Sequence, residues 1–418
     1  PAAERKPNFL FVYTDDQRYD ALGVVQREQG QRARFPWFQT PNLDRMAGEG
    51  MRFRNAFVTL SLCAPSRAAF LTGRYNHANG VIDNHTPFPT NSVTHASLLR
   101  AAGYRTAYIG KWHHGAQRGQ RPGFDYSASF VGQGRYDNCP FEINGVTTET
   151  KGWVDDVSTD FAIEFLKQNK DRAFSLVIGY KATHGPNTPP DRAKDRFAGA
   201  KARSVPNLGV RPIYRGAADA PAAKKQTASA EAEVDINVNY FRCLSAMDDN
   251  MGRLLKALDD LGLADNTVVV FTSDNGYYNG EHGLGDKRSA YDQSLRIPML
   301  VRYPRLVGPG TLCDDMVLNI DIAPTFLELA AVPVPTTMQG KSWQPLLAGK
   351  KVAWRQSFLA EYFYERGFVG TPSLVAVRTA DAKLIKYPGH EDWTELFDLK
   401  NDPYELPNLA NDSAHKQL

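Results

Sequence analysis

The chain has 418 residues, with 49 Lys and Arg against 46 Asp and Glu, and 42% of its residues are hydrophobic. This composition is that of an ordinary globular protein and excludes general disorder, while a net charge of +3 gives no reason to expect nucleic acid or a membrane as partner. Four cysteines with no Cys-x-x-Cys pair exclude a disulfide scaffold and a zinc finger. No apolar run reaches the ~20 residues of a membrane-spanning helix.

The periodicity of the chain predicts an α/β fold. Short apolar runs are typical of buried parallel strands, and they occur at Phe9–Tyr13, Thr106–Ile109, Phe174–Ile178, Val268–Phe271 and Met299–Val301. Amphipathic helical stretches lie between or after them, at Thr40–Ala47, Asp155–Gln168, Asp235–Leu261 and Ile320–Leu329, the last with Asp321 as its expected cap. We therefore expect a large, mostly parallel sheet sandwiched between helices.

Two regions depart from this alternation. Residues Pro186–Glu233 are rich in Pro, Ala, Lys and Arg, and we expect a surface excursion that shapes a substrate pocket. Near the end of the chain, Phe358–Phe363, Leu374–Thr379 and Lys383–Tyr387 predict short antiparallel strands. We therefore expect a catalytic α/β domain over 1–348 and a small C-terminal α+β subdomain with an antiparallel sheet over 349–418.

No signal peptide is evident before the first apolar run, so we expect a mature form or a chain from which such a segment was removed. The residues present do not indicate a compartment.

Polar residues follow four of the predicted strands. Asp15 and Asp16 follow the first, Lys111 to His114 end the second, His184 follows the third, and Asp274 and Asn275 follow the fourth. In an α/β sheet, ligands bind beyond the carboxyl ends of the strands, so these side chains are expected to share one edge. Taken singly, each of these segments is more typical of a cap or a turn, but four of them at one sheet edge are not explained by turns.

The oxygen ligands of Asp15, Asp16, Asp274 and Asn275 suit a hard divalent cation, Ca²⁺ or Mg²⁺. Three neighbouring carboxylates would otherwise repel and raise one another's pKa values, a conflict that a metal ion removes. Zinc fits less well because the cluster is rich in oxygen.

The segment Cys63-Ala64-Pro65-Ser66-Arg67 followed by Leu71-Thr72-Gly73 predicts a helix with Pro65 in its first turn and Gly73 at its end. Cys63 then lies at the helix start and shares a face with Arg67, four residues on. This pattern indicates a nucleophile beside an anion-binding guanidinium. The alternative is a buried structural cysteine.

This segment resembles the Cys-x-Pro-Ser-Arg signature of the formylglycine-dependent (type I) sulfatase family, of the alkaline-phosphatase-like superfamily. The resemblance extends in order along nearly the whole chain: Asp15-Asp16, Gly110-Lys111-Trp112-His113, Ser273-Asp274-Asn275-Gly276, Gly280 to Leu284 with Lys287, Gln339 to Ser342, and Leu396 to Leu399 with Asp402-Pro403 and Asn408-Leu409. A looser likeness, at Arg121 to Asp125 and Gly132-Gln133-Gly134, is to sulfatases that act on sulfated sugars.

The resemblance implies a sulfuric ester hydrolase acting on a sulfated carbohydrate. In this family the motif cysteine, here Cys63, is oxidised by a formylglycine-generating enzyme, and the hydrated aldehyde attacks sulfur with one hydroxyl while the other later expels sulfate. The resemblance implies a divalent cation, Ca²⁺ with Mg²⁺ as the alternative, held by Asp15, Asp16, Asp274, Asn275 and the modified Cys63. A periplasmic or extracellular location is expected from the family.

Catalytic roles follow the same resemblance. Arg67, Lys111 and Lys287 would offset charge on the sulfuryl oxygens, His184 with Lys287 would protonate the leaving alcohol, and His113 would act as the base for elimination. Asp83, Asn84, His85 and His282 are candidate sugar contacts, with a turn slightly favoured for Asp83 and Asn84. A structural or surface role is favoured over catalysis for four histidines, His77, His85, His114 and His282.

Two other functions stay open. One is a phosphodiesterase or phosphonate monoester hydrolase of the same superfamily, because sulfate and phosphate esters are both tetrahedral. The other is an inactive glycan-binding homologue, which would be expected to have lost the nucleophile, the arginine or the metal carboxylates. The sequence does not give the sugar or the sulfate position.

Overall fold

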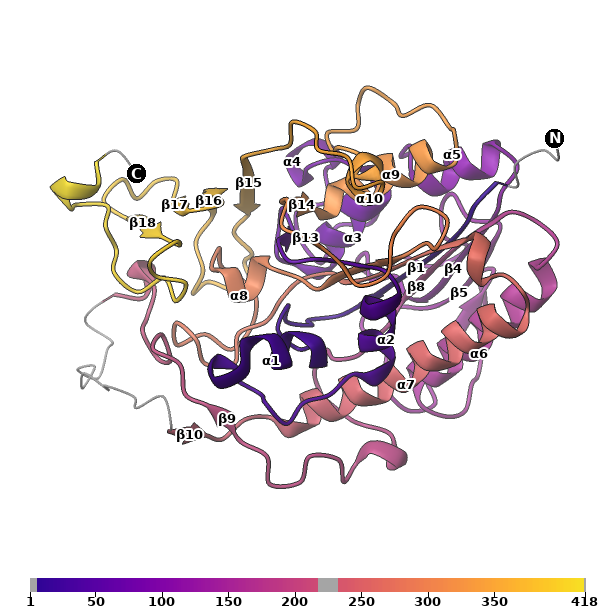
Figure 1. The fold of residues 1–418 in the computed structure, drawn as a ribbon, viewed down its shortest axis with the longest axis horizontal. Helices are drawn as coiled ribbons and strands as arrows, with labels where there is room; N and C mark the ends of the chain where they lie inside the picture. Colours follow the sequence, from indigo (N-terminus) through magenta and orange to yellow (C-terminus); the bar gives the residue numbers. More distant parts are fainter. Residues whose placement is uncertain (1–5, 217–231, 417–418) are drawn as a thin grey trace.

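In the computed structural model, which describes residues 6–216 and 232–416, a ten-stranded sheet forms the centre of the protein (Figure 1). Its strands run in the order β13 (Thr311–Cys313), β2 (Met51–Phe53), β12 (Met299–Arg302), β11 (Thr267–Ser273), β1 (Asn8–Thr14), β8 (Phe174–Gly179), β4 (Arg105–Lys111), β5 (Tyr126–Phe130), β6 (Phe141–Ile143) and β7 (Val146–Thr148). The five strands from β11 to β5 are mutually parallel, which confirms the predicted fold class.

Helices cover both faces of this sheet (Figure 1). One layer contains α1 (Gly23–Gln29), α2 (Pro41–Glu49), α6 (Val154–Asn169) and α7 (Val238–Asp260). The other contains α3 (Cys63–Thr72), α4 (Asn76–Asn79), α5 (His95–Ala101), α9 (Ile322–Leu329) and α10 (Gln344–Leu347).

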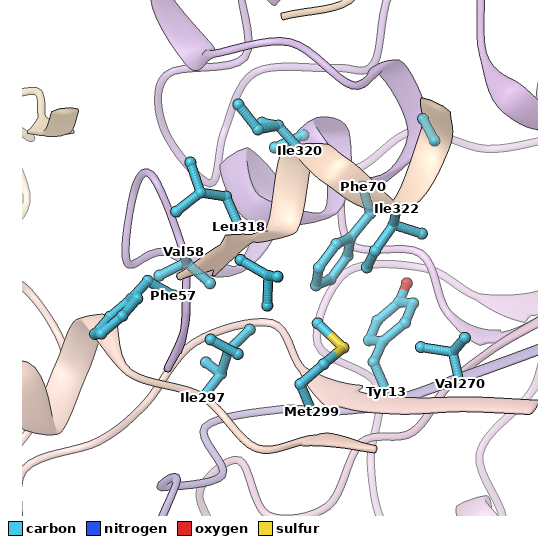
Figure 2. Close-up of a cluster of buried hydrophobic side chains, with 14 of the residues drawn as sticks. Tyr13, Phe57, Val58, Phe70, Val270, Ile297, Met299, Leu318, Ile320 and Ile322 are labelled. Atoms are coloured by element: carbon cyan, nitrogen blue, oxygen red, sulfur yellow. The ribbon is translucent and has the colours of Figure 1, made fainter. Parts of the chain in front are cut away.

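The side chains of β1 alternate between two hydrophobic cores, as the pleat of a strand requires. Phe9, Phe11 and Tyr13 pack in the core beneath α3 and α9, whereas Leu10 and Val12 pack in the core beneath α2, α6 and α7. Figure 2 shows the first core, in which Tyr13 and Phe70 lie close to Met299 and Ile322. Burial on both faces explains why the central strands read as continuous apolar runs.

The prediction that Met299–Val301 is a parallel strand is wrong. This run forms β12, which pairs antiparallel with β11. The chain leaves β11 at its carboxyl end and stays at that edge through the short helix α8 (Asp292–Leu295), with no crossover across a face of the sheet. The next strand must therefore run back in the opposite direction.

The expected cap of α9 also differs. Asp321 precedes the helix, but its carboxylate makes no capping bond there. It accepts instead from the backbone N–H groups of Leu318 and Lys341, each at 2.8 Å, and pairs with Arg355.

The C-terminal region forms a separate antiparallel sheet of β15 (Ser357–Tyr362), β16 (Leu374–Thr379), β17 (Ala382–Lys386) and β18 (Thr394–Asp398). The first three strands were predicted; β18 was not. A buried ion cluster fastens this sheet to α8, because Lys383 Nζ lies 2.7 Å from Asp292 and 2.6 Å from Glu405, and Arg378 also pairs with Asp292. The boundary at residues 348 and 349 stays a prediction.

Smaller pairings complete the fold. β3 (Ala56–Phe57) pairs with β14 (Val317–Leu318), and β9 (Ala202–Arg203) pairs with β10 (Glu233–Val234). The second pair closes the base of the predicted excursion, of which residues 217–231 lie outside the described part. All four cysteines are unpaired and buried. No helix among the described residues is long and apolar enough to cross a membrane.

Candidate active site

The ends of β1 and β11 bring two pairs of polar residues together. The two strands pair in parallel, with Thr14 opposite Ser273, so Asp15 and Asp274 leave the sheet side by side. The N–H of Asp274 donates to the carbonyl oxygen of Thr14 at 3.0 Å, which extends the ladder by one more residue. Asp16 then turns back with a φ of 63°, a left-handed conformation that non-glycine residues adopt mainly where the surrounding structure imposes it.

Helix α3 delivers Cys63 to these carboxylates. One ligand atom each of Asp15, Asp16, Cys63 and Asp274 lie within 4.8 Å of one another, and all four residues are buried. The thiol of Cys63 lies 3.3 Å from Asp15 Oδ1.

Both ends of α3 lie where the sequence pattern predicts them. The helix begins at Cys63, where Asn84 Oδ1 accepts from the N–H of Ala64 at 3.0 Å. It ends at Gly73, whose φ of 65° and N–H bond to the carbonyl oxygen of Ala69 are typical of a C-terminal cap.

Three cations enclose this acidic cluster. Arg67 donates from Nε and Nη2 to Asp274 Oδ2 at 3.0 and 2.8 Å, and from Nη2 to Asp15 Oδ2 at 2.9 Å. Lys111 pairs with the same oxygen of Asp15. Lys287 Nζ lies 2.7 Å from Asp16 Oδ1 and 3.3 Å from Cys63 Sγ. Three buried carboxylates therefore face three buried cations.

Burial and charge set opposite pKa shifts on two of these carboxyl groups. Burial alone would raise the pKa of Asp15, but Lys111, His184 and Arg67 outweigh it and hold that pKa well below its usual range. Burial and the neighbouring Asp15 raise the pKa of Asp274. Burial and Asp15 likewise raise the pKa of the Cys63 thiol.

The donor set fits a hard divalent cation. Asn275 donates from Nδ2 to Asp16 Oδ1 at 2.6 Å, while its Oδ1 is buried and has no hydrogen-bond partner in the described part of the chain. An orphaned carbonyl oxygen beside three carboxylates is the kind of ligand that Ca²⁺ or Mg²⁺ prefers. Asp15, Asp16, Asp274 and Asn275 are therefore the residues that could hold such an ion.

The two predicted catalytic histidines, His184 and His113, differ in the hydrogen bonds that their ring nitrogens make. A ring nitrogen of His184 lies within 4.8 Å of Asp15 and Cys63 ligand atoms. Its Nδ1 is 2.8 Å from the carbonyl oxygen of Gly185, so Nδ1 carries the proton and the neutral ring accepts at Nε2. His113 is buried, with a φ of 52°, and its Nε2 lies 2.9 Å from Gln133 Nε2 while its Nδ1 has no partner among the described residues.

Both rings are held neutral. Burial and the nearby Lys111 lower the pKa of His184 to about 4. Burial, Lys111 and Arg67 hold the pKa of His113 well below its usual range.

The four candidate sugar contacts differ in exposure, and none of them lines the cavity that opens beside the cluster. Asp83 Oδ1 accepts from the N–H groups of His85 and Thr86 at 2.9 and 2.8 Å, which is turn chemistry, and Asn84 caps α3. His85 is exposed.

His282 is only 2% exposed. It stacks on Tyr291 with ring centroids 3.8 Å apart and contacts Asn207 Nδ2 at 3.1 Å. The structure therefore does not bring His282 to an open pocket.

A cavity of about 500 Å³ opens beside the cluster, with Asp16 in its wall. This volume is within the usual range of small-molecule sites. Residues that sequence reasoning did not single out line it, among them Asn187, Asn237, Tyr240, Tyr277 and Asn279. They come from loops and from the start of α7, where no periodic pattern marks a functional role. Gln133 was noted only for its resemblance, and its contact with His113 was not foreseen.

Comparison with known proteins adds to this geometry. A sequence model of the sulfatase family (Sulfatase) matches residues 7–332, and one described as N-sulphoglucosamine sulphohydrolase, C-terminal, matches residues 280–418. The chain is 31% identical to N-acetylglucosamine-6-O-sulfatase of Bacteroides thetaiotaomicron, across 97% of this chain and 83% of that protein. It is 28% identical to N-acetylglucosamine-6-sulfatase of Homo sapiens, across 98% and 82%.

Two solved structures are also similar. One is of a protein in complex with its substrate, D-glucosamine-2-N,6-O-disulfate, with a TM-score of 0.87, 31% identity, and coverage of 99% of this chain and 95% of that one. The other, a phosphonate monoester hydrolase of Agrobacterium radiobacter, has a TM-score of 0.76 with 20% identity over 98% and 92%, a likeness of fold alone.

Proposed function

The chain belongs to the sulfatase family, whose members hydrolyse sulfate esters, and from this premise we propose that it removes the 6-O-sulfate group of a glucosamine-type sugar. The observation that carries the proposal is the convergence of Cys63, three carboxylates and the cations Arg67, Lys111 and Lys287 in one buried cluster. The sugar is inferred from the relatives and from the substrate-bound neighbour.

The charges of the cluster suit a sulfate ester together with a cation. Three carboxylates and three basic side chains balance, so a divalent cation leaves the site positive and ready for an anionic ester. When bound or formed there, Ca²⁺ or Mg²⁺ supplies a Lewis acid and formylglycine at Cys63 supplies a hydrated aldehyde as nucleophile. Asp15, Asp16, Asp274 and Asn275 are the residues that would hold the ion.

Three basic side chains of the cluster would bind the sulfate group of the substrate. Arg67, Lys111 and Lys287 bind the sulfuryl oxygens and offset the charge that grows on them in the transition state. Their buried, water-poor surroundings strengthen each of these contacts.

The histidines handle protons. His184 holds one proton at Nδ1, bonded to Gly185, so its Nε2 must gain a second before it can protonate the leaving alcohol. A bound anionic ester favours that second proton, because it opposes the burial and the positive Lys111 that lower the pKa of the ring. His113 is the base that we propose for the elimination step, and Gln133, whose Nε2 lies 2.9 Å from the Nε2 of the ring, orients it.

The cavity beside the cluster suits a sugar. The amides of Asn187, Asn237 and Asn279 offer both donors and acceptors to hydroxyl groups, and the Tyr240 and Tyr277 rings stack with centroids 5.9 Å apart. Polar groups of both kinds beside aromatic rings match the mixed polar and apolar faces of a pyranose.

The first test is the modification of Cys63. After co-expression with a formylglycine-generating enzyme, peptide mass spectrometry should find oxygen in place of sulfur at this residue, and Cys63→Ala should abolish turnover while leaving the thermal unfolding transition in place. Full activity in folded Cys63→Ala would refute the assignment.

The second test is the substrate. N-acetylglucosamine-6-sulfate should release sulfate faster than its 3-sulfate isomer and faster than galactose-6-sulfate. Preference for a phosphodiester or a phosphonate monoester over all three sugars would favour the other hydrolase of the superfamily. Tight binding of the sugars without release of sulfate by the modified protein would favour a glycan-binding role. A location outside the cytoplasm remains part of the proposal.

A further inference from the structure

Two adjoining cavities lie apart from the catalytic cluster, lined by residues of α1 and by Arg296 at the end of α8. Their volumes are about 190 and 230 Å³, and they share four lining residues, Tyr19, Gln29, Arg32 and Arg296. Together they form what we call the arginine groove, defined by Arg18, Arg32, Arg34, Arg52, Arg54 and Arg296.

The carboxylates of the groove are outnumbered and already occupied. Arg18 pairs with Asp20 at 2.8 Å, and both Arg18 and Arg34 pair with Glu281. Arg52 and Arg54 share Glu28 in the same way. Arg54 also pairs with Asp314 at 3.3 Å. Six guanidinium groups therefore face four carboxylates, an excess of two positive charges.

Two of the arginines have no carboxylate partner. Arg32 is exposed, and its side chain makes no hydrogen bond or ion pair within the described ranges 6–216 and 232–416. Arg296 bonds through Nε to the carbonyl oxygen of Arg54 at 2.9 Å and lies 4.3 Å from the centroid of the Tyr19 ring, contacts that orient the guanidinium group. Its positive charge also acts on Asp292, but the two form no direct ion pair among the described residues. An oriented guanidinium without a direct ion pair is a preformed anion contact.

Donor atoms within the groove are also unsatisfied. The Nε atoms of Arg34 and Arg52 are buried and lack a partner in the described chain, although the two residues are only 3% and 7% exposed. Buried donors are normally bonded, so these two guanidinium groups are incompletely satisfied within the described chain. Tyr404, half-buried in the same wall, offers a ring face with no aromatic partner among the described residues.

A single loop separates the groove from the catalytic cavity. Asn279, Gly280 and Gly283 line the catalytic cavity, whereas Glu281 of the same loop lines the groove. Glu281 fastens this wall, because it accepts from the N–H of Asn279 at 2.7 Å and pairs with Arg18 and Arg34. A chain that leaves the catalytic cavity over this loop reaches the arginines next.

We propose that the arginine groove binds a second anionic group, a sulfate or a carboxylate, of the same acidic polysaccharide whose sulfate ester enters the catalytic cavity. The proposal rests on the proposed function for its choice of a glycan. Each cavity is smaller than the ~300–1,000 Å³ of a typical small-molecule site, which suits one charged group or one sugar ring. The enzyme would thus favour chains over monosaccharides, because the groove adds binding that a single sugar does not reach.

The test is binding of fluorescein-labelled dextran sulfate to the full chain loaded with Ca²⁺, followed by fluorescence anisotropy, with unsulfated dextran as the uncharged probe. Arg32→Gln should raise the Kd for dextran sulfate by ~3-fold, because the ion pair to the anion is lost. Arg32→Glu should raise it by ~10-fold, because the glutamate also repels the anion. Because Arg32 has no partner in the described chain, neither change breaks a contact of the fold.

The matched control is Arg100→Glu. Arg100 is equally exposed and lacks a partner in the described chain, but it lies on α5, in the helix layer of the opposite face. Its variant should shift the Kd less than ~2-fold. Equal shifts for Arg32→Glu and Arg100→Glu, or no binding of dextran sulfate at all, would overturn the proposal.

Hydrogen exchange gives a second, independent readout. Dextran sulfate should protect amides of residues 29–34 and 52–54, and protection confined to 277–285 would place the probe in the catalytic cavity alone and overturn the groove. The two proposals fail separately. Loss of the proposed function would appear as no sulfate release from glucosamine-type sugars, with Arg32-dependent binding intact, whereas failure of the groove would leave that release unchanged.

Discussion

Replacing Arg67 by Met would test the charge balance of the catalytic cluster. The methionine side chain keeps much of the arginine volume, while three hydrogen bonds to Asp15 and Asp274 disappear. Both carboxylates are fully buried, so the three negative charges of the cluster would then face only two positive charges, those of Lys111 and Lys287. Breaking a buried ion pair by removing one partner costs ~3–5 kcal/mol, and we expect a loss of this size in the free energy of unfolding when a chelator is present.

The same variant should respond unusually strongly to Ca²⁺. An ion bound at the carboxylates restores the missing positive charge, so saturating Ca²⁺ should recover more unfolding free energy in the variant than in the wild type. Turnover of 4-nitrophenyl sulfate should nevertheless stay ~100- to 1,000-fold low in kcat, because a transition-state contact to the sulfuryl group is gone.

Urea unfolding followed by tryptophan fluorescence, with and without Ca²⁺, measures the stability terms. Arg100→Met, on the exposed surface of α5, is the control and should lie within ~0.5 kcal/mol of wild type. A loss below ~1 kcal/mol for Arg67→Met in chelator, or a Ca²⁺ response no larger than that of wild type, would refute the charge balance inferred here.

Four further outcomes follow from the geometry. Chelation should abolish turnover, Ca²⁺ or Mg²⁺ should restore it, and Asp274→Asn should weaken the ion affinity measured by calorimetry. Burial lowers the pKa of His95 to about 3, so protonation of this ring destabilises the native state. The contribution of neutral His95 to the free energy of unfolding is complete above the unfolded pKa of ~6.5 and falls by ~1.4 kcal/mol per pH unit below it. In urea titrations, wild type should therefore lose ~2 kcal/mol more than His95→Leu between pH 8 and about 5. Gln133→Leu should lower kcat and move the pH profile, because the orientation of His113 is lost. Asn187→Ala should reduce kcat/KM for a sulfated sugar far more than for an aryl sulfate.

Each of these has a result that contradicts it. Zinc alone in metal analysis, or unchanged ion affinity in Asp274→Asn, would remove the hard-cation site. Identical pH dependence of stability in wild type and His95→Leu would mean that the ring is not buried. An unchanged pH profile in Gln133→Leu would deny it a positioning role, and equal losses for both substrates in Asn187→Ala would place Asn187 in the sulfate-binding cluster.

The central strands could be predicted because their burial on two faces leaves a strong signal. All five predicted apolar runs are strands, and they lie next to one another as β12, β11, β1, β8 and β4. The hydrophobic pattern does not determine whether a strand is parallel or antiparallel, because a buried strand of either kind is a continuous apolar run. The antiparallel direction of β12 results from the short connection that precedes it. Strands of three residues, such as β6 and β7, are too short to show any period.

Most residues of the catalytic cluster could also be predicted, because they follow predicted strands. Parallel strands deliver the residues after them to one edge, so Asp15 and Asp274 had to meet once β1 and β11 were neighbours. Lys287 follows no strand, and only the family resemblance pointed to it. The structure shows how it is placed: the adjacent Arg288 pairs with Glu365 at 2.7 Å, so the C-terminal region holds this segment against the site.

The walls of the cavity and the arginine groove could not be predicted, because both are built from loops that meet only in three dimensions. Arg18 and Glu281 are 263 positions apart by their numbers in the chain, yet they form one ion pair between the two cavities. Neither residue has a periodic context that separates it from an ordinary surface charge. The same loop thus contributes to ester recognition on one side and to anion binding on the other, so substitutions of Glu281 should alter both the KM for a sulfated sugar and the Kd for a polyanion, whereas substitutions of Arg32 should alter the second alone.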